Sequence, residues 1–128
     1  MNYQDIEKLA SLKESNNLEF KESTGQLDRS METLCAFLNC EGGTILYGVK
    51  DNGKIAGVRS DEEQYMIEAA ARLYCRPEVS YSTQTYQVEG RSVLLVQIDE
   101  SDRKPVYAKD EAGKYLAYLR IKDENILA

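Results

Sequence analysis

Three segments of the chain have the hydrophobic spacing of amphipathic helices. Apolar side chains recur three or four positions apart from about Tyr3 to Leu12, from about Asp28 to Leu38 and from about Asp61 to Tyr74. Such spacing gathers the apolar side chains on one face of a helix, so each segment is predicted to be helical. Asp28 is a typical N-cap for the second helix, and Gly42-Gly43 is a typical stop after it.

Strand patterns occupy much of the remaining chain. Leu18–Lys21 alternates apolar and charged side chains, and Thr44–Val49 is a β-branched and aliphatic run of the kind found at the centre of a sheet. Further strands are predicted over Lys54–Val58, Thr83–Val88, Ser92–Ile98, Val106–Ala108 and Tyr115–Ile121. Asp51-Asn52-Gly53 is predicted to supply the positive-φ residues of the first hairpin turn. The sequence therefore predicts an α+β fold, with a mixed, mostly antiparallel sheet and about three helices packed on it.

Size and charge narrow the classes of function. The chain has 128 residues, 42% of them hydrophobic, which suits a single domain over residues 1–128. Its 16 basic and 22 acidic residues give a net charge of −6, so phosphate contact requires a local basic patch. We expect a cytoplasmic protein without a membrane partner, because neither a signal peptide nor an apolar run of about 18 residues is present.

The residue types exclude several kinds of chemistry. The chain contains no histidine, so a general base would have to be a carboxylate, a lysine, a tyrosine or a metal-bound hydroxide. The three cysteines lack C-x-x-C spacing, which argues against a disulfide framework or a zinc site. Gly42-Gly43 follows the end of a helix, where carbonyl groups point outward, so it is not expected to cradle a phosphate. No phosphate-binding loop is present, and no cofactor is expected.

Six short motifs occur in an order that resembles the Schlafen AlbA-like domain. They are Leu18-Glu19-Phe20-Lys21-Glu22-Ser23, Cys35-Ala36-Phe37-Leu38-Asn39, Glu41-Gly42-Gly43-Thr44, Gly48-Val49-Lys50-Asp51-Asn52-Gly53, Gly57-Val58 and Lys104-Pro105-Val106-Tyr107. That family, also called divergent AAA and described as a DNA-binding domain, occurs in many bacterial transcriptional regulators. The resemblance covers about Glu14 to Lys122. It implies an α+β fold, DNA or RNA as the partner, and the N-terminal module of a longer regulator.

The resemblance also implies a candidate catalytic site. Animal relatives include endoribonucleases with three carboxylates, in which two glutamates lie five positions apart and an aspartate follows the glycine-rich strand. Glu14 and Glu19 match that spacing, and Asp51 is the nearest match for the third acid. The family often has two acidic residues after Gly-Val, whereas Lys50 precedes Asp51 here.

Converging carboxylates repel one another unless a cation or a proton neutralises them, so such a cluster would bind Mg²⁺ or Mn²⁺. Each acid also has an ordinary structural interpretation. Glu14 suits a solvated helix end, Glu19 suits a partner for Lys21 or for a helix terminus, and Asp51 suits a hairpin turn.

Basic side chains form the second candidate site. The predicted nucleic-acid-binding residues are Lys21, Lys50, Lys54, Arg103, Lys104 and Arg120. On one face, together with neighbouring basic residues, they would make a stripe of roughly six to eight charges, enough for salt-dependent phosphate contact. Tyr107, Tyr115 and Tyr118 are interleaved with them and are candidates for stacking on bases. Acidic residues in the same segments leave a mixed, solvated surface as the alternative.

Two functions remain open from the sequence. The preferred one is a nucleic-acid-binding module of a bacterial transcriptional regulator, and the alternative is a metal-dependent endoribonuclease using Glu14, Glu19 and Asp51. Ile126 and Leu127 at the end of the chain either fold onto the core, pack across a homodimer or begin a further element.

Overall fold

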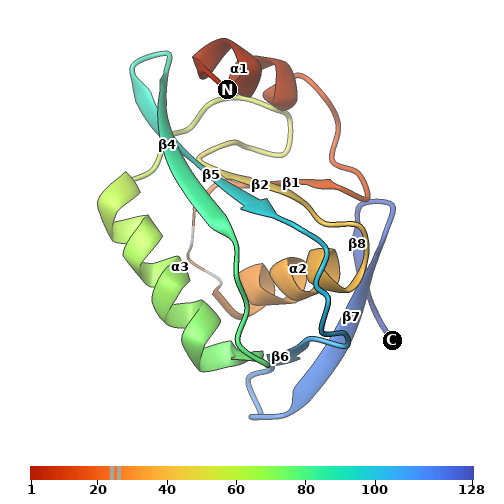
Figure 1. Cartoon of the computed structure of the whole chain (residues 1–128). Helices are drawn as coiled ribbons and strands as arrows, with labels where there is room; N and C mark the ends of the chain where they lie inside the picture. The colour runs from red at the N-terminus through yellow and green to blue at the C-terminus, as the bar shows by residue number, and fades with distance from the viewer. Residues whose placement is uncertain (24, 26) are drawn as a thin grey trace.

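The computed structural model describes residues 1–23, 25 and 27–128, which form three helices and two four-stranded sheets (Figure 1). The helices are α1 (Tyr3–Ala10), α2 (Leu27–Asn39) and α3 (Ser60–Tyr74). The strands are β1 (Leu18–Lys21), β2 (Gly43–Tyr47), β3 (Cys75–Arg76), β4 (Ser82–Val88), β5 (Arg91–Ile98), β6 (Tyr107–Lys109), β7 (Tyr115–Ile121) and β8 (Glu124–Leu127). The predicted α+β class is confirmed, although the strands divide between two sheets.

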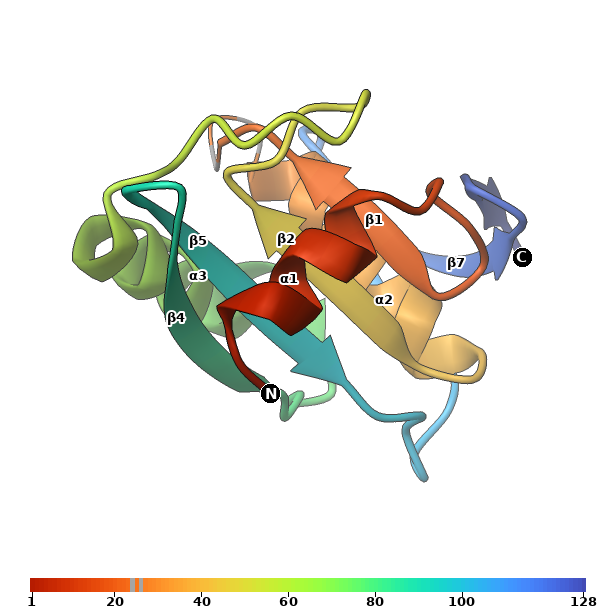
Figure 2. The ribbon, with the colours of Figure 1, turned by 90° about the horizontal axis from the view of Figure 1, so that it is seen from above.

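The first sheet has the strand order β1-β2-β5-β4, with β1 parallel to β2 and the other pairs antiparallel. Strand β2 is internal, as its apolar sequence predicts. Alternate side chains of β2 enter different cores: Leu46 packs with Ile6 of α1, whereas Ile45 and Tyr47 pack with α2 and α3. Figure 2 shows α1 lying across one face of this sheet.

The second sheet has the order β3-β6-β7-β8 and is antiparallel throughout. Helix α2 lies between the two sheets (Figure 1), which explains why residues on both of its sides are buried. The buried amide of Asn39 joins α2 to this sheet, because its Nδ2 donates to the carbonyls of Val106 and Tyr118 at 2.9 Å each. Its Oδ1 accepts from the N–H of Val106 at 2.7 Å.

Local differences from the sequence prediction occur at turns and ends. Asp28 lies inside the first turn of α2, so its predicted N-cap position is wrong. The predicted strand 54–58 is reduced to a single bridge between Val49 and Ile55. The chain then leaves the hairpin, because the N–H of Val58 bonds to the carbonyl of Ser92 instead.

Of the three turn residues Asp51, Asn52 and Gly53 that were predicted to have positive φ, only Gly53 does, at φ +87°. A Cβ on Gly53 would lie 2.2 Å from the carbonyl oxygen of Ala10, so the hairpin tip is packed tightly against the end of α1. The helix stop at Gly42 is confirmed: its φ is +82° and its N–H bonds to the carbonyl of Phe37 at 2.9 Å.

The last residues form β8, which pairs with β7 and leaves Ile126 and Leu127 largely exposed. The cysteines are free thiols, and those of Cys35 and Cys75 are buried 3.5 Å apart. In the part of the chain that the structure describes, no helix has the length and apolar character needed to cross a bilayer.

Candidate functional site

Glu14 occupies the free edge of the first sheet. Strand β1 pairs with β2 on one side only, so its outer backbone groups need other partners. Oε2 of Glu14 accepts a hydrogen bond from the N–H of Phe20 at 2.9 Å, and the N–H of Ser15 bonds to the carbonyl of Leu18 at 2.9 Å. The interpretation of Glu14 as a solvated residue is therefore wrong, because its half-buried side chain caps an edge strand.

Glu19 points away from α1 because it alternates with Leu18 and Phe20, which pack beneath that helix. On this side of the sheet its Oε1 lies 2.7 Å from Nη2 of Arg120, and its Oε2 lies 3.2 Å from Nζ of Lys21. The carboxylate of Glu19 is therefore neutralised by two cations of the protein itself.

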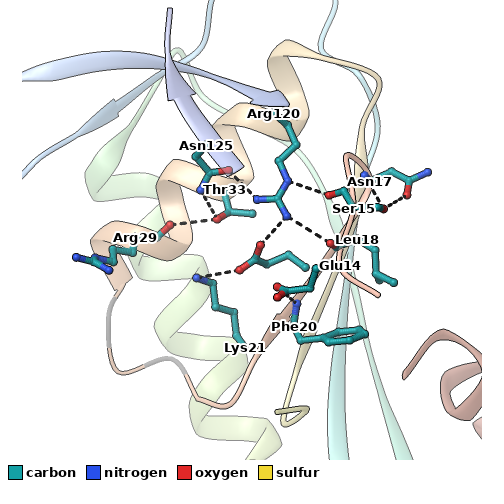
Figure 3. A network of polar contacts seen from close by, with 11 residues as sticks. Glu14, Ser15, Asn17, Leu18, Phe20, Lys21, Arg29, Thr33, Arg120 and Asn125 are labelled. Atoms are coloured by element: carbon teal, nitrogen blue, oxygen red, sulfur yellow. Dashed lines mark hydrogen bonds and ion pairs between the residues drawn. The ribbon is translucent and has the colours of Figure 1, made fainter. Parts of the chain in front are cut away.

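Arg120 is the centre of a buried polar network (Figure 3). Besides Glu19, its guanidinium donates to the carbonyls of Ser15 at 3.0 Å and Leu18 at 3.4 Å and to Oδ1 of Asn125 at 2.9 Å. It also lies over the ring of Phe37, 5.1 Å from the centroid. The Arg120 side chain is only 1% exposed, so its predicted place in a nucleic-acid interface is corrected: it joins β7 to β1 in the interior.

The network continues from Arg120 into α2. Nδ2 of Asn125 donates to Oγ1 of Thr33 at 2.8 Å, and that hydroxyl donates in turn to the carbonyl of Arg29 at 3.4 Å. Strand β8 is thereby tied to the helix that separates the two sheets. Nothing in the local sequence predicted this role for Asn125 or Arg120, since their partners are far away along the chain.

The charges of Glu19 and Asp51 both act on the pKa of Glu14, so the three predicted acids lie in one neighbourhood. Burial is the largest cause that raises the pKa of Glu14 above its usual 4.5; the charge of Glu19, a side-chain hydrogen bond with Glu19 and the charge of Asp51 raise it further. The hydrogen bond from Phe20 acts in the opposite direction. Glu14 therefore holds a proton more tightly than an exposed glutamate does, because it is partly buried and lies beside the negative charge of Glu19.

Asp51 lies exposed on the hairpin, but the side chain that bonds to the turn is that of Asn52, whose Oδ1 accepts from the N–H of Lys54 at 3.0 Å. Among residues 1–23, 25 and 27–128, no group of three or more acidic or cysteine side chains is arranged to hold a metal ion. Both oxygens of Glu19 and one of Glu14 already accept bonds from protein groups. The carboxylates are therefore neighbours, but they are not arranged as a ready-made metal centre.

The remaining predicted basic residues fall into two groups. Lys21 lies beside the first hairpin, because its carbonyl accepts from the N–H groups of Gly48 and Val49, and Lys50 and Lys54 face each other across that hairpin. Arg103 and Lys104 follow the end of β5, which is paired with the start of β2. The two groups lie at opposite ends of β2, about 13 Å apart along a strand of this length, so they do not form one stripe.

A further cation, Arg91, lies near the hairpin and was missed in the sequence. Its Nη1 donates to the carbonyl of Ala56 at 3.1 Å, and its side chain lines a hollow of about 440 Å³ together with Ser23 and Arg59. Arg91 begins β5 and lies about 40 positions after Lys50, so the sequence did not predict that it would lie near the first hairpin.

Comparisons with known proteins identify, for most of the chain, the family that the sequence motifs resemble. Residues 14–128 match the family Schlafen, AlbA_2. The solution NMR structure of the N-terminal domain of a RecG-related protein from Nitrosomonas europaea, named as a candidate ATP-dependent DNA helicase, is 25% identical and has a TM-score of 0.67. The alignment covers 94% of this chain and 88% of that domain.

A second solved structure, the DIP2311 protein from Corynebacterium diphtheriae, has a TM-score of 0.69 at 17% identity. The alignment covers 88% of this chain but 25% of DIP2311, so the chain spans a quarter of that protein. At this identity the similarity shows a shared fold.

Proposed function

The chain belongs to the Schlafen AlbA_2 family, and we propose that it is a nucleic-acid-binding domain of a transcriptional regulator. The observation that carries this proposal is the group of lysines around the first hairpin. Lys21, Lys50 and Lys54 are brought to one end of the first sheet by backbone hydrogen bonds rather than by flexible contacts. We call these three residues the hairpin lysines.

The hairpin lysines suit phosphate contact because, among the described residues, the ion pairs include neither Lys50 nor Lys54. Lys21 pairs with Glu19, but Glu19 also pairs with Arg120, so the three side chains together carry a net positive charge. A local basic surface can therefore exist on a chain whose net charge is −6.

A second candidate function is a metal-dependent endoribonuclease using Glu14, Glu19 and Asp51. This function is favoured by the proximity of the three acids, since the charges of both Glu19 and Asp51 raise the pKa of Glu14. A Mg²⁺ or Mn²⁺ ion would have to displace Lys21 from Glu19, since both oxygens of that carboxylate are occupied. Because the metal ion would have to break this ion pair first, we prefer the nucleic-acid-binding function to the nuclease function.

A salt titration tests the proposed function. We expect the affinity for DNA or RNA to fall as salt rises, with a slope of about two to three for two to three phosphate contacts. An absence of binding to either nucleic acid at about 50 mM salt, where such contacts are strong, would reject the proposal.

A further inference from the structure

The second sheet has one covered and one uncovered face. Cys75, Ala108 and Tyr118 point inward and are buried in the core beside α2. Their strand neighbours alternate to the other side, and in the described part of the chain no helix lies over that side (Figure 1). The outer face is therefore available to a partner.

Strand register gathers two tyrosines and two cations on this outer face. Arg76 of β3 is paired with Tyr107 of β6, and Lys109 of β6 is paired with Tyr115 of β7. Because Tyr107 is paired with Ala117, the two tyrosines are diagonal neighbours, a separation of about 7–8 Å between backbones. We call Arg76, Tyr107, Lys109 and Tyr115 the tyrosine platform.

The arginine of the tyrosine platform is held in a fixed position. Its Nη1 donates to the carbonyls of Arg72 at 2.8 Å and Cys75 at 2.7 Å. These bonds place the guanidinium over the ring of Tyr115, 5.8 Å from the centroid. Arginine has five N–H donors, so the bonds from Nη1 leave Nε and Nη2 able to meet a phosphate.

We infer that the tyrosine platform binds single-stranded nucleic acid, an inference that rests on the proposed function. Tyr107 and Tyr115 are 38% and 40% exposed, so an unpaired base can reach part of each ring, on Tyr115 the part that Arg76 leaves uncovered. Arg76 lies over Tyr115 and Lys109 is paired with Tyr115 in the strand register, so both cations can complement the phosphates of the same strand. In a duplex the bases are stacked on one another, so the platform selects single strands.

Charge favours this partner over a second protein copy. Ile121 and Ile126 lie farther along β7 and β8 and are also exposed, which would suit an apolar contact between copies. A contact through these isoleucines would use neither Arg76 nor Lys109, whereas a nucleic acid engages both the rings and the cations.

The experiment compares the double variant Tyr107→Leu/Tyr115→Leu with wild type and with Tyr65→Leu. Tyr65 is 67% exposed on α3, so it controls for loss of a surface tyrosine elsewhere. Fluorescence anisotropy measures binding to labelled oligo-dT, to an abasic oligonucleotide of equal length and charge, and to duplex DNA. Sedimentation velocity of each variant records the oligomeric state.

We expect wild type and Tyr65→Leu to bind oligo-dT at least roughly tenfold more tightly than the abasic strand, because each stacked base contributes about 1–3 kcal/mol. The double variant loses this preference and keeps its duplex affinity. An unchanged preference in the double variant overturns the platform and leaves the proposed function intact. A change in sedimentation without a change in affinity also overturns it. No binding by wild type to any of the three probes rejects the proposed function itself.

Discussion

Nη2 of Arg120 lies 2.7 Å from Oε1 of Glu19, although the two residues are 101 positions apart in the chain. This contact joins β7 of the second sheet to β1 of the first sheet. It lies on the face of the first sheet that is turned toward α2 (Figure 1). The other carboxylate oxygen of Glu19 lies 3.2 Å from Nζ of Lys21. The acid that resembles a catalytic residue is therefore part of the link between the two sheets.

Replacing Arg120 with methionine should destabilise the fold by roughly 3–5 kcal/mol, because the largely buried Glu19 loses one of its two cationic partners and three further acceptors lose a donor. Urea unfolding measures this change in the free energy of unfolding. Arg103→Met is the matched control, since Arg103 is exposed and its substitution should change stability by less than about 0.5 kcal/mol. Equal stability of the two variants would show that Arg120 does not hold the sheets together.

The pH dependence of stability should differ between wild type and Glu14→Gln. The pKa of Glu14 is raised in the folded state, mainly by burial, so folding favours the protonated form. The stabilisation from Glu14 is then complete below the usual pKa of 4.5 and is lost as the pH rises through the folded pKa. Glutamine keeps an acceptor for the N–H of Phe20 but does not titrate.

The Glu14→Gln variant should therefore gain stability relative to wild type as the pH rises from 4.5, and the difference should level off once Glu14 is ionised. Denaturant midpoints at several pH values give the difference directly. Glu41→Gln on the exposed surface serves as the control for the loss of one charge. A stability difference that is constant over this range, or that shrinks as the pH rises, would contradict the raised pKa.

Structured RNA such as tRNA should remain intact when incubated with the protein and Mg²⁺ or Mn²⁺, because Glu19 is occupied by Arg120 and Lys21. Denaturing gel electrophoresis measures the cleavage. Asp51→Asn is the informative variant, since Asp51 is exposed and its substitution leaves the buried network in place. Metal-dependent cleavage by wild type that is lost in Asp51→Asn would establish the nuclease function instead.

Local sequence patterns predicted most helices and strands because those elements depend on short-range periodicity. Leu18–Lys21, for example, forms β1 within the predicted limits, and the apolar run at Thr44 forms the internal strand β2. Gly42 ends α2 as expected because its positive φ is easily reached by glycine.

The division into two sheets could not be predicted from such patterns, since it depends on contacts between distant segments. Asn39 and Arg120 both look like ordinary polar residues in the sequence, yet both are buried and satisfied by partners far along the chain. For the same reason Arg120 was grouped with surface cations.

The candidate site was predicted in part. The family resemblance implied that Glu14 and Glu19 belong to one site, and in the structure Glu19 is close enough to raise the pKa of Glu14. Of the two cations that pair with Glu19, the sequence suggested Lys21 as a partner. Arg120 could be recognised as a partner only from the folded structure.

The most direct test of the account compares the affinities of two double variants for the same nucleic acid across a range of salt. Lys50→Ala/Lys54→Ala removes two hairpin lysines, while Arg103→Ala/Lys104→Ala removes two cations at the opposite end of β2, one of them already paired with Glu100. We predict that the first variant lowers the salt slope by about two and weakens binding, and that the second changes neither. Equal effects of the two variants, or an effect of the second alone, would contradict binding through the hairpin lysines.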